Sequence, residues 1–385
     1  MRKKNLFLML TLAIALCAGC GQAGSVPADG TAGHTFDTEA EFAGTQSAED
    51  DSSAQETDFR ALVDGKIRSY FTGEWTPQEV AKKRPLAIML NNTSVALPMS
   101  GVSEASVIYE CPVEGRITRW MGIYEDWEDL SRIGSVRSCR LYYLHFAQEF
   151  DAVYSHFGQA VYALKDLNSG EYDVLSGGTS GIERPATAMY DRISRPGKAM
   201  EHTLYAFPKG IRKDIEKKGY DMTMPEDYEG KFKFADAGEI VEYEDYPDAT
   251  FLQPGGMGGK NGFGGVQATF EYNPSDQKYY RSTYGNPHMD ELSGEQVAVT
   301  NVIFQYCDGE VLDAKDYLHF ATQSQNNDCI VFTNGKMIEG YWTNPGELGT
   351  PARYYDNNNQ EITLNTGKTF ICIIWNDYKD DVVIQ

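Results

Sequence analysis

The sequence predicts an α/β N-terminal domain with a partly parallel sheet, followed by a mostly antiparallel β C-terminal domain. Three observations support this fold class. Short apolar runs alternate with helical segments from about residue 84 to 210, which is typical of an α/β layer. Beyond about residue 230, alternating runs separated by turn residues replace the helical segments. The chain has 385 residues, of which 41% are hydrophobic, and this length suits two packed domains.

The first 20 residues are predicted to be a lipoprotein signal peptide. Residues 2–4 are positively charged, and residues 6–19 form a mostly apolar run that is short for a membrane-spanning helix. The run ends at Cys20 in the sequence Leu-Cys-Ala-Gly-Cys, which resembles a bacterial lipobox, although Cys17 replaces the usual leucine. We therefore expect cleavage before Cys20 and diacylation of that cysteine. The alternatives are an ordinary signal peptide cut nearby or an uncleaved anchor.

Residues 21–83 are predicted to be a disordered, acidic tether. Residues 21–58 contain nine Asp and Glu side chains and no Lys or Arg, and they are rich in Gly, Ala, Ser and Thr. Such a segment buries too little apolar surface to offset the entropy lost when it is ordered. A flexible chain of about 40 residues would hold the folded body on the order of 35 Å from its anchor. Residues 84–223 and 232–385 are the expected α/β and β-rich domains.

The charge balance excludes nucleic acid as a partner. The chain has 34 Lys and Arg against 56 Asp and Glu, a net charge of −22, and such a body repels phosphate backbones. Five cysteines follow Cys20, an odd number without the C-x-x-C or His-pair spacing of a zinc site. Most are expected to be buried thiols, and one unassigned disulfide among Cys307, Cys329 and Cys372 stays open. We predict no metal and no cofactor.

The N-terminal domain is predicted from alternating strand and helix patterns. Helices are expected where apolar residues recur at a spacing of three or four, and strands at short apolar runs. In order, the expected elements are strands Leu86 to Leu90, Ser106 to Glu110 and Ile117 to Tyr124, a helix Ser138 to Phe150, a strand Ala152 to Phe157, and helices Gln159 to Leu167 and Ile211 to Lys218. This order favours helices packed on a partly parallel sheet.

The C-terminal domain is predicted from strand and turn signals. A hairpin is expected from Val266 to Thr283, because an Asn-Pro-Ser-Asp turn signal at 273–276 separates two alternating runs. Further strands are expected at Asn301 to Tyr306, Cys329 to Thr333, Ile338 to Trp342, Arg353 to Tyr355, Glu361 to Leu364 and Thr369 to Trp375, which together suggest a sandwich. The glycine-rich stretch 254–265 lacks the signature of a phosphate-binding loop and is interpreted as a flexible surface loop.

Charged and polar side chains that could bind a ligand gather mainly between residues 91 and 158. The candidates are Asn91, Glu110, Glu114, Arg119, Arg137, Arg140, Asp151, His156 and, further along, His202. Open α/β sheets bind ligands at the carboxyl ends of strands. Because Arg137 and Arg140 lie near a predicted helix start, their guanidiniums would suit phosphate or carboxylate. The alternative is a partly buried ion-pair network that only orders the domain.

Several segments resemble the YerB-like family of bacterial lipoproteins. The similar segments are RPLAIMLNN (84–92), the stretch 100–110, VEGRITR (113–119), IGSVRSCR (133–140), EFDAVYSHFG (149–158), GNPHMD (285–290), NVIFQ (301–305), FTNGKMIEGYW (332–342) and LNTGKTFICI (364–373). Arg116, Ser135 and Cys139 depart from the family pattern, where Gly, Pro and a small residue are common. The resemblance covers nearly all of the folded body. It implies two domains behind a lipid anchor, with no assigned activity and no catalytic residue to carry over.

The combined pattern predicts a non-enzymatic lipoprotein on the extracytoplasmic face of the cell membrane. It would be held there by the lipid on Cys20 and would bind a cell-wall polymer such as peptidoglycan, or an envelope partner protein. The alternative is an enzyme acting on an anionic wall polymer or its lipid-linked precursor. In that alternative the arginines at 119, 137 and 140 hold the anion, while Glu110, Asp151 or His156 transfers protons. A solute-binding lipoprotein is a third hypothesis, which the β-rich second half disfavours.

Overall fold

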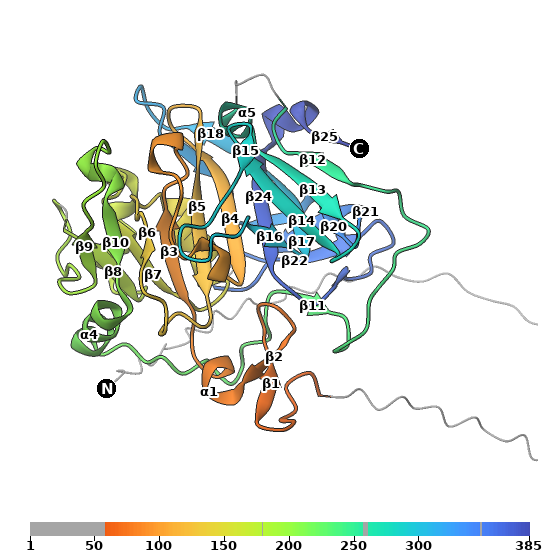
Figure 1. Cartoon of the computed structure of the whole chain (residues 1–385), viewed down its shortest axis with the longest axis horizontal. Coiled ribbons are helices and arrows are strands. Elements are labelled where there is room, and N and C mark those ends of the chain that lie inside the picture. Colours follow the sequence, from red (N-terminus) through yellow and green to blue (C-terminus); the bar gives the residue numbers. More distant parts are fainter. Residues whose placement is uncertain (1–57, 179, 257–260, 347–348) are drawn as a thin grey trace, which may run out of the picture. The chain divides into compact units, whose positions relative to one another are not determined.

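A ten-stranded mixed sheet runs through the centre of the molecule (Figure 1). The computed structural model describes residues 58–178, 180–256, 261–346 and 349–385. In spatial order the strands of this large sheet are β22 (Arg353–Asp356), β21 (Lys336–Asn344), β20 (Ser324–Thr333), β17 (Asn301–Cys307), β24 (Thr369–Trp375), β4 (Val107–Val113), β5 (Ile117–Tyr124), β3 (Leu86–Leu90), β7 (Val153–Phe157) and β8 (Val174–Gly177).

Seven strands of the large sheet run in one direction, and six of them form two parallel groups that end at the same edge. β8, β7 and β3 are mutually parallel, as are β4, β24 and β17. Because β5 is antiparallel to both β3 and β4, the two groups share a direction. The strands β20, β21 and β22 are antiparallel to their neighbours. The predicted fold class, a partly parallel N-terminal sheet and mostly antiparallel C-terminal strands, is confirmed.

The two sequence ranges expected as domains share this large sheet. β4 belongs to 84–223 and β24 to 232–385, yet the two strands pair in parallel, with Val107 opposite Thr369 and Glu110 opposite Cys372. The chain from Thr57 to Gln385 forms one compact unit. The two ranges are therefore two halves of one hydrogen-bonded sheet.

A second, six-stranded sheet packs on one face of the large sheet. Its strands are β12 (Phe251–Gln253), β13 (Thr269–Asn273), β14 (Lys278–Thr283), β15 (Asn286–Pro287), β16 (Ala298–Val299) and β25 (Val383–Ile384). Phe270 and Tyr279 of this sheet share a core with Trp120, Phe304 and Phe370 of the large sheet. The predicted hairpin is confirmed, because β13 and β14 pair from Thr269 to Asn273.

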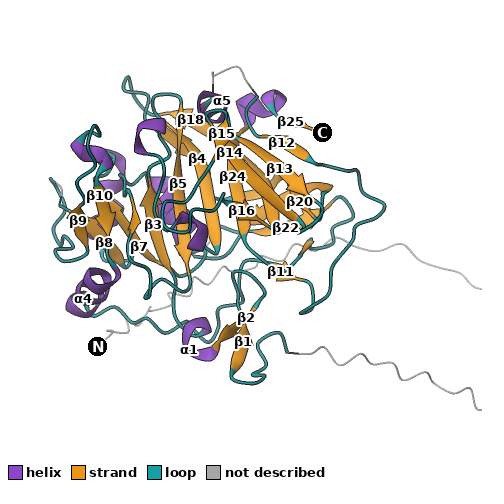
Figure 2. Ribbon diagram, in the orientation of Figure 1, coloured by secondary structure: helices purple, strands orange, loops and turns teal. Residues whose placement is uncertain are grey.

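The opposite face of the large sheet is covered by α2 (Leu141–Gln148) and by loops. Tyr142, Tyr143 and Phe146 of this helix share a core with Met121 and Ile371 of the sheet. Figure 2 shows that helices are short and few beside the strands. The other α-helices are α1 (Gln78–Ala81), α3 (Leu164–Ser169), α4 (Pro208–Lys218) and α5 (Gly262–Val266).

Four small sheets complete the described structure. A three-stranded sheet joins β6 (Ile133–Gly134), β10 (Leu204–Ala206) and β9 (Tyr190–Arg192), and it supports the segment that follows β6. The two-stranded sheets are β1 (Lys66–Arg68) with β2 (Trp75–Pro77), β11 (Lys233–Phe234) with β23 (Thr363–Leu364), and β18 (Gly309–Val311) with β19 (Leu318–Phe320).

The tether was predicted to extend too far along the chain. Residues 66–81 fall within the predicted tether but form β1, β2 and α1. Ile67 and Phe71 are buried there, and Phe71 joins the core on the α2 face. These apolar side chains stabilise a folded structure in this part of the chain. The signal peptide 1–20 and the tether residues 21–57 lie outside the described residues.

The glycine-rich stretch is not a surface loop throughout. Residues 262–266 form α5, and Asn261 is its N-cap residue. The side-chain oxygen of Asn261 accepts a hydrogen bond from the Gly264 N–H at 2.8 Å. Gly262 is buried, and a Cβ there would lie 2.6 Å from the carbonyl oxygen of Ile117. The glycines thus permit close packing of α5 on β5. Residues 257–260 lie outside the described residues.

The open question of a disulfide is answered by the described thiols, none of which is paired with another. Cys111, Cys139, Cys307, Cys329 and Cys372 are all buried free cysteines. Cys307 and Cys329 belong to the core on the α2 face, whereas Cys372 belongs to the core between the two sheets.

Within the described ranges, no helix is long and apolar enough to cross a membrane.

Candidate anion-binding site

The candidate site lies where β3 and β7 end. Residues 133–140 cross the carboxyl ends of these strands. The Arg137 N–H donates to the Met89 carbonyl at 3.0 Å, and the Asn91 N–H donates to the carbonyl of Ser135 at 3.0 Å. The segment therefore lies at the edge where open sheets that contain parallel strands bind ligands.

Arg119 on β5 is a buried cation. Its residue is only 6% exposed, and it lies opposite Cys111 of β4. Its Nη1 donates to the carbonyl oxygen of Ser138 at 2.8 Å. Burial lowers the pKa of Arg119, and among the described residues no carboxylate forms an ion pair with its guanidinium. A buried charge of this kind is costly unless an anion compensates it.

Arg137 places a second guanidinium near the first. Burial is the largest cause that lowers the pKa of Arg137, and the positive charge of Arg119 adds to it. Nη1 of Arg137 donates to the Glu201 carbonyl at 3.2 Å and lies 3.8 Å from the exposed carboxylate of the same residue. Its Nε is buried and has no hydrogen-bond partner among the described residues. Arg137 thus has an unsatisfied donor and lies near a second cation, Arg119. Both features favour the binding of an external anion.

Asn91 and His202 form the wall next to Arg137. Nδ2 of Asn91 lies 2.9 Å from Nδ1 of His202, and the Asn91 Oδ1 accepts hydrogen bonds from Thr93. The pKa of His202 is lowered first by burial and then by the charge of Arg137. His202 is therefore neutral at pH 7, with Nδ1 as the acceptor and Nε2 directed to Glu201 at 3.3 Å.

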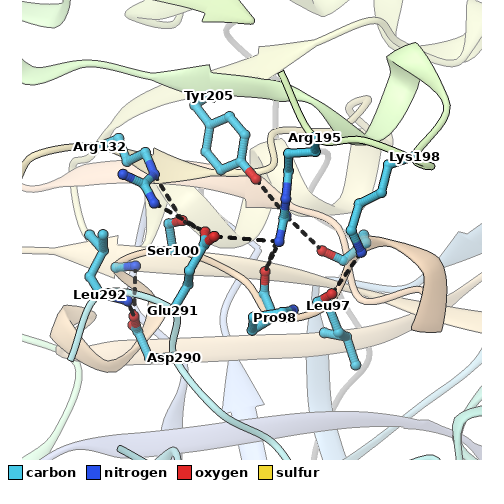
Figure 3. Close-up of polar contacts among 12 residues, drawn as sticks. Leu97, Pro98, Ser100, Arg132, Arg195, Lys198, Tyr205, Asp290, Glu291 and Leu292 are labelled. Atoms are coloured by element: carbon cyan, nitrogen blue, oxygen red, sulfur yellow. Dashed lines mark hydrogen bonds and ion pairs between the residues drawn. The ribbon is translucent and has the colours of Figure 1, made fainter. Parts of the chain in front are cut away.

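Three further cations lie nearby, and two of them pair with one carboxylate, Glu291, as Figure 3 shows. Arg132 lies in the loop directly before β6. Arg195 and Lys198 lie in the segment between β9 and β10. Arg132 and Arg195 are 3.2 and 3.5 Å from Glu291. The Lys198 Nζ donates to two main-chain carbonyls of the 95–97 loop at 2.6 and 2.8 Å. Carbonyl dipoles and a single carboxylate thus face three positive charges.

These cations are electrostatically continuous with the first pair. After burial, the charge of Arg195 contributes to a lowered pKa of Lys198, and the charge of Lys198 contributes to the lowered pKa of His202. We refer to the basic cluster as Arg119, Arg132, Arg137, Arg195 and Lys198. On a chain with a net charge of −22, this cluster concentrates positive charge at one edge of the sheet.

Arg140 does not contribute to this site as the sequence predicted. Its Nε donates to Glu114 at 2.9 Å, and its Nη2 forms a second, shorter contact to the same carboxylate. Its Nη1 donates to the carbonyl of Cys139 at 2.7 Å. The bidentate pair neutralises Arg140, so Glu114 and Arg140 follow the ion-pair alternative.

Glu110 is also an internal ion-pair partner. It is fully buried, and its Oε2 accepts a hydrogen bond from Nη2 of Arg281 on β14 at 2.9 Å. Asn92 and Thr118 donate to the same carboxylate. Sequence reasoning missed Arg281. The available signal was its place in the alternating run Tyr279, Arg281, Thr283, whose side chains all face the core.

Asp151 lies far from the basic cluster along the strands, and His156, near the end of β7, is bonded to other partners. Asp151 precedes β7, at the opposite end of the parallel strands, and its carboxylate pairs with Arg84 at 2.9 Å. His156 is buried, with Nδ1 2.7 Å from the Gly158 carbonyl and Nε2 2.9 Å from the Ser176 hydroxyl. Burial lowers the pKa of His156 to about 4. His156 is therefore a structural residue with a hydrogen-bond partner at each ring nitrogen.

Metal-ligand geometry is not found in the described parts of the chain. Among those residues, no group of three or more His, Cys, Asp or Glu side chains is placed to hold a metal ion. The chemistry that the arrangement offers is electrostatic and hydrogen-bonding recognition of an anion by guanidinium groups.

A mixed sheet shared by two sequence halves, with a basic cluster at its carboxyl edge, defines the structural class of this protein. Comparison with known proteins supplies the family. Residues 71–221 match the family described as protein of unknown function (DUF3048) N-terminal domain, and residues 262–371 match its C-terminal domain. The chain belongs to the DUF3048 family.

The relatives confirm the resemblance to YerB-like proteins. The chain is 28% identical over 314 residues to the Bacillus subtilis (strain 168) protein named "Putative lipoprotein YerB", which covers 80% of this chain and 86% of that protein. A crystal structure of the YerB protein from Bacillus subtilis has a TM-score of 0.69 at 24% identity, covering 83% of this chain and all of that chain. The structural likeness confirms the fold. The relative's name fits a lipoprotein, and Cys20 itself lies outside the described residues.

Proposed function

We propose that this protein is lipid-anchored through Cys20 on the extracytoplasmic face of the cell membrane and binds an anionic cell-wall polymer at the basic cluster. One observation carries the proposal: Arg119 is buried beside Arg137 and has no carboxylate partner among the described residues. A phosphate or carboxylate group would compensate both charges and accept bidentate hydrogen bonds from a guanidinium.

The binding function is favoured over the enzymatic alternative because the expected proton-transfer groups are engaged elsewhere. Glu110 is paired with Arg281 inside the core. Asp151 lies at the other end of the strands, beside Arg84. His156 is neutral and hydrogen-bonded on both ring nitrogens. None of these three faces the guanidiniums of Arg119 and Arg137 as general acid–base catalysis requires.

Sedimentation of the purified protein with isolated cell walls tests this proposal. Arg137→Gln should weaken retention by about tenfold, because it removes a charged hydrogen-bond donor. Arg212→Gln is the matched control, because it removes the same charge at a site outside the basic cluster. Arg212 lies on α4 and pairs with Glu128 at 3.1 Å. Retention is also measured on walls stripped of their phosphate polymers. A loss of retention there would identify phosphate as the bound group, and unchanged retention would identify a peptidoglycan carboxylate. Equal retention of Arg137→Gln and the unaltered protein on intact walls would contradict the proposal.

A further inference from the structure

A pocket lies at the carboxyl edge of the large sheet, with a lining that includes no residue of the basic cluster. Its volume is about 570 Å³, and its lining includes Glu114, Arg116, Val311, Asp316, Trp375 and Tyr378. The turn between β4 and β5 contributes the first two, and the ends of β18 and β24 contribute Val311 and Trp375. Figure 1 shows β18 and α5 near each other at this edge. The pocket therefore opens where the parallel strands β4 and β24 end, a usual location for ligands.

Two aromatic rings form an apolar wall of this pocket. Trp375 ends β24, and Tyr378 lies in the short 3-10 helix η5 (Asn376–Asp381) that follows. The ring of Trp375 meets Tyr378 edge-on at 5.5 Å and Phe320 edge-on at 5.8 Å. Both lining rings remain partly exposed. Val311 adds an exposed aliphatic surface, since 51% of the residue is accessible. Such rigid rings present flat contact area at low entropic cost.

Carboxylates supply the polar groups of the pocket. Arg140 fixes the Glu114 carboxylate through two hydrogen bonds, and the Glu114 side chain remains 25% exposed. Asp316 and Arg116 both adopt positive φ angles, of 58° and 57°, in the turns that border the pocket. Carboxylate oxygens accept hydrogen bonds from hydroxyl groups, and each carboxylate can accept several.

We propose that this pocket binds a pyranose unit of an uncharged glycan. A pyranose ring has an apolar C–H face that suits Trp375 and Tyr378, and an edge of hydroxyl donors that suits Glu114 and Asp316. The charges of Glu114 and Asp316 are balanced by those of Arg140 and Arg116, so an anion gains little. Arg140 neutralises Glu114 and Arg116 adds a positive charge, so a cation gains little. The pocket is separate from the basic cluster and does not depend on it.

Calorimetric titration of the full-length protein with cellotetraose and with tetra-N-acetylchitotetraose tests the saccharide site. Saturable binding of at least one oligosaccharide is expected. Val311→Glu places a charged side chain on the pocket wall and should weaken binding at least tenfold. Val63→Glu is the matched control, because Val63 is 46% exposed and lies outside the pocket lining; it should leave binding unchanged.

Two further variants separate folding from recognition. Tyr378→Ala removes an aromatic ring that lies on the surface and should reproduce the loss seen with Val311→Glu. Arg137→Gln should retain full oligosaccharide affinity, whatever its effect on wall retention. The proposal is overturned if neither oligosaccharide binds the unaltered protein, or if Val311→Glu and Tyr378→Ala, both with unchanged thermal unfolding, bind as tightly as the parent.

Discussion

Glu110 and Arg281 are both fully buried, and their ion pair joins β4 of the large sheet to β14 of the second sheet. The Arg281 guanidinium also lies over the rings of Phe270 and Trp120, at 5.1 and 5.7 Å. Two charges in such surroundings are tolerable only together, because each is desolvated and depends on the other.

Removing one member of this pair should therefore be more damaging than removing both. Arg281→Met is expected to lower the free energy of unfolding by about 3 to 5 kcal/mol, since Glu110 is left buried without its counter-charge. The double variant Glu110→Gln, Arg281→Met should recover part of that loss. Urea unfolding of the three proteins measures both effects. A double variant less stable than Arg281→Met would show that the pair is not the coupled unit described here.

Glu125 provides a pH-dependent residue outside the proposed sites. Its Oε2 accepts a hydrogen bond from Ser69 at 2.7 Å, while its buried Oε1 has no partner among the described residues. Burial is the main cause that raises the pKa of Glu125 from 4.5 to about 7. The folded state therefore retains a proton that the unfolded chain releases between these two values.

The raised pKa of Glu125 predicts lower stability at higher pH. Its contribution is fully present below pH 4.5 and is lost as the pH rises through about 7, a change of about 3 kcal/mol. Glu125→Gln cannot titrate but can still accept from Ser69. The stability of this variant relative to the parent should rise by about that amount between pH 4 and pH 8. Urea unfolding at both pH values checks this, and a constant difference would refute it.

At the scale of elements, α5 shows how backbone contact fixes a helix. A Cβ on Gly265 would lie 2.0 Å from the carbonyl oxygen of Arg116. Gly265→Ala should therefore destabilise the protein by about 1 to 3 kcal/mol through overpacking and should weaken saccharide binding, because Arg116 borders that pocket. Gly178→Ala is the control, since its nearest atom, in the Phe157 ring, lies 3.3 Å away. Equal thermal stability of the two variants would contradict this account.

Elements with a strong local pattern were predictable from the sequence. The strands Leu86–Leu90, Ile117–Tyr124 and Thr369–Trp375 have the predicted bounds, because each is a short apolar run buried on both faces. α5 was not predictable, since glycines favour a helix only where close packing on another backbone excludes side chains. The hairpin correspondingly begins at Thr269 and not at Val266.

The candidate site was predictable in location but not in membership. Asn91, Arg119 and Arg137 do lie at the carboxyl edge of the sheet, a position that follows from strand direction. The sequence alone could not separate Arg137 from Arg140, since the difference lies in Glu114, which only the β4–β5 turn brings to Arg140. Arg195 and Glu291 are far apart in sequence and meet only through tertiary packing.

At the scale of the whole molecule, the basic cluster is an exception on an acidic chain with a sequence pI of about 4.7. Association with an anionic wall would have to overcome the repulsion of the remaining surface. Both effects act through charge, but Arg119 and Arg137 are largely buried. Contacts that they would make with the wall should therefore be screened less than surface repulsion.

Salt should therefore act on wall binding in two stages. Raising the ionic strength from about 0.01 to 0.1 M shortens the screening length from about 30 to 10 Å and should relieve the long-range repulsion. Higher salt, near 1 M, should then weaken the contacts themselves. We expect wall retention to pass through a maximum when it is measured by sedimentation across this range. A steady increase up to 1 M would indicate apolar binding and would argue against the basic cluster.

The pairing of β4 with β24 has a consequence for how this chain can be divided. Cutting the gene between the two sequence halves would leave unpaired N–H and C=O groups along β4 and along β24. Each strand is mostly apolar and long enough to pair with a strand of another chain. Each fragment made alone should precipitate, whereas two fragments synthesised together could rejoin. Insertions and deletions that survive in evolution should accordingly leave this seam untouched.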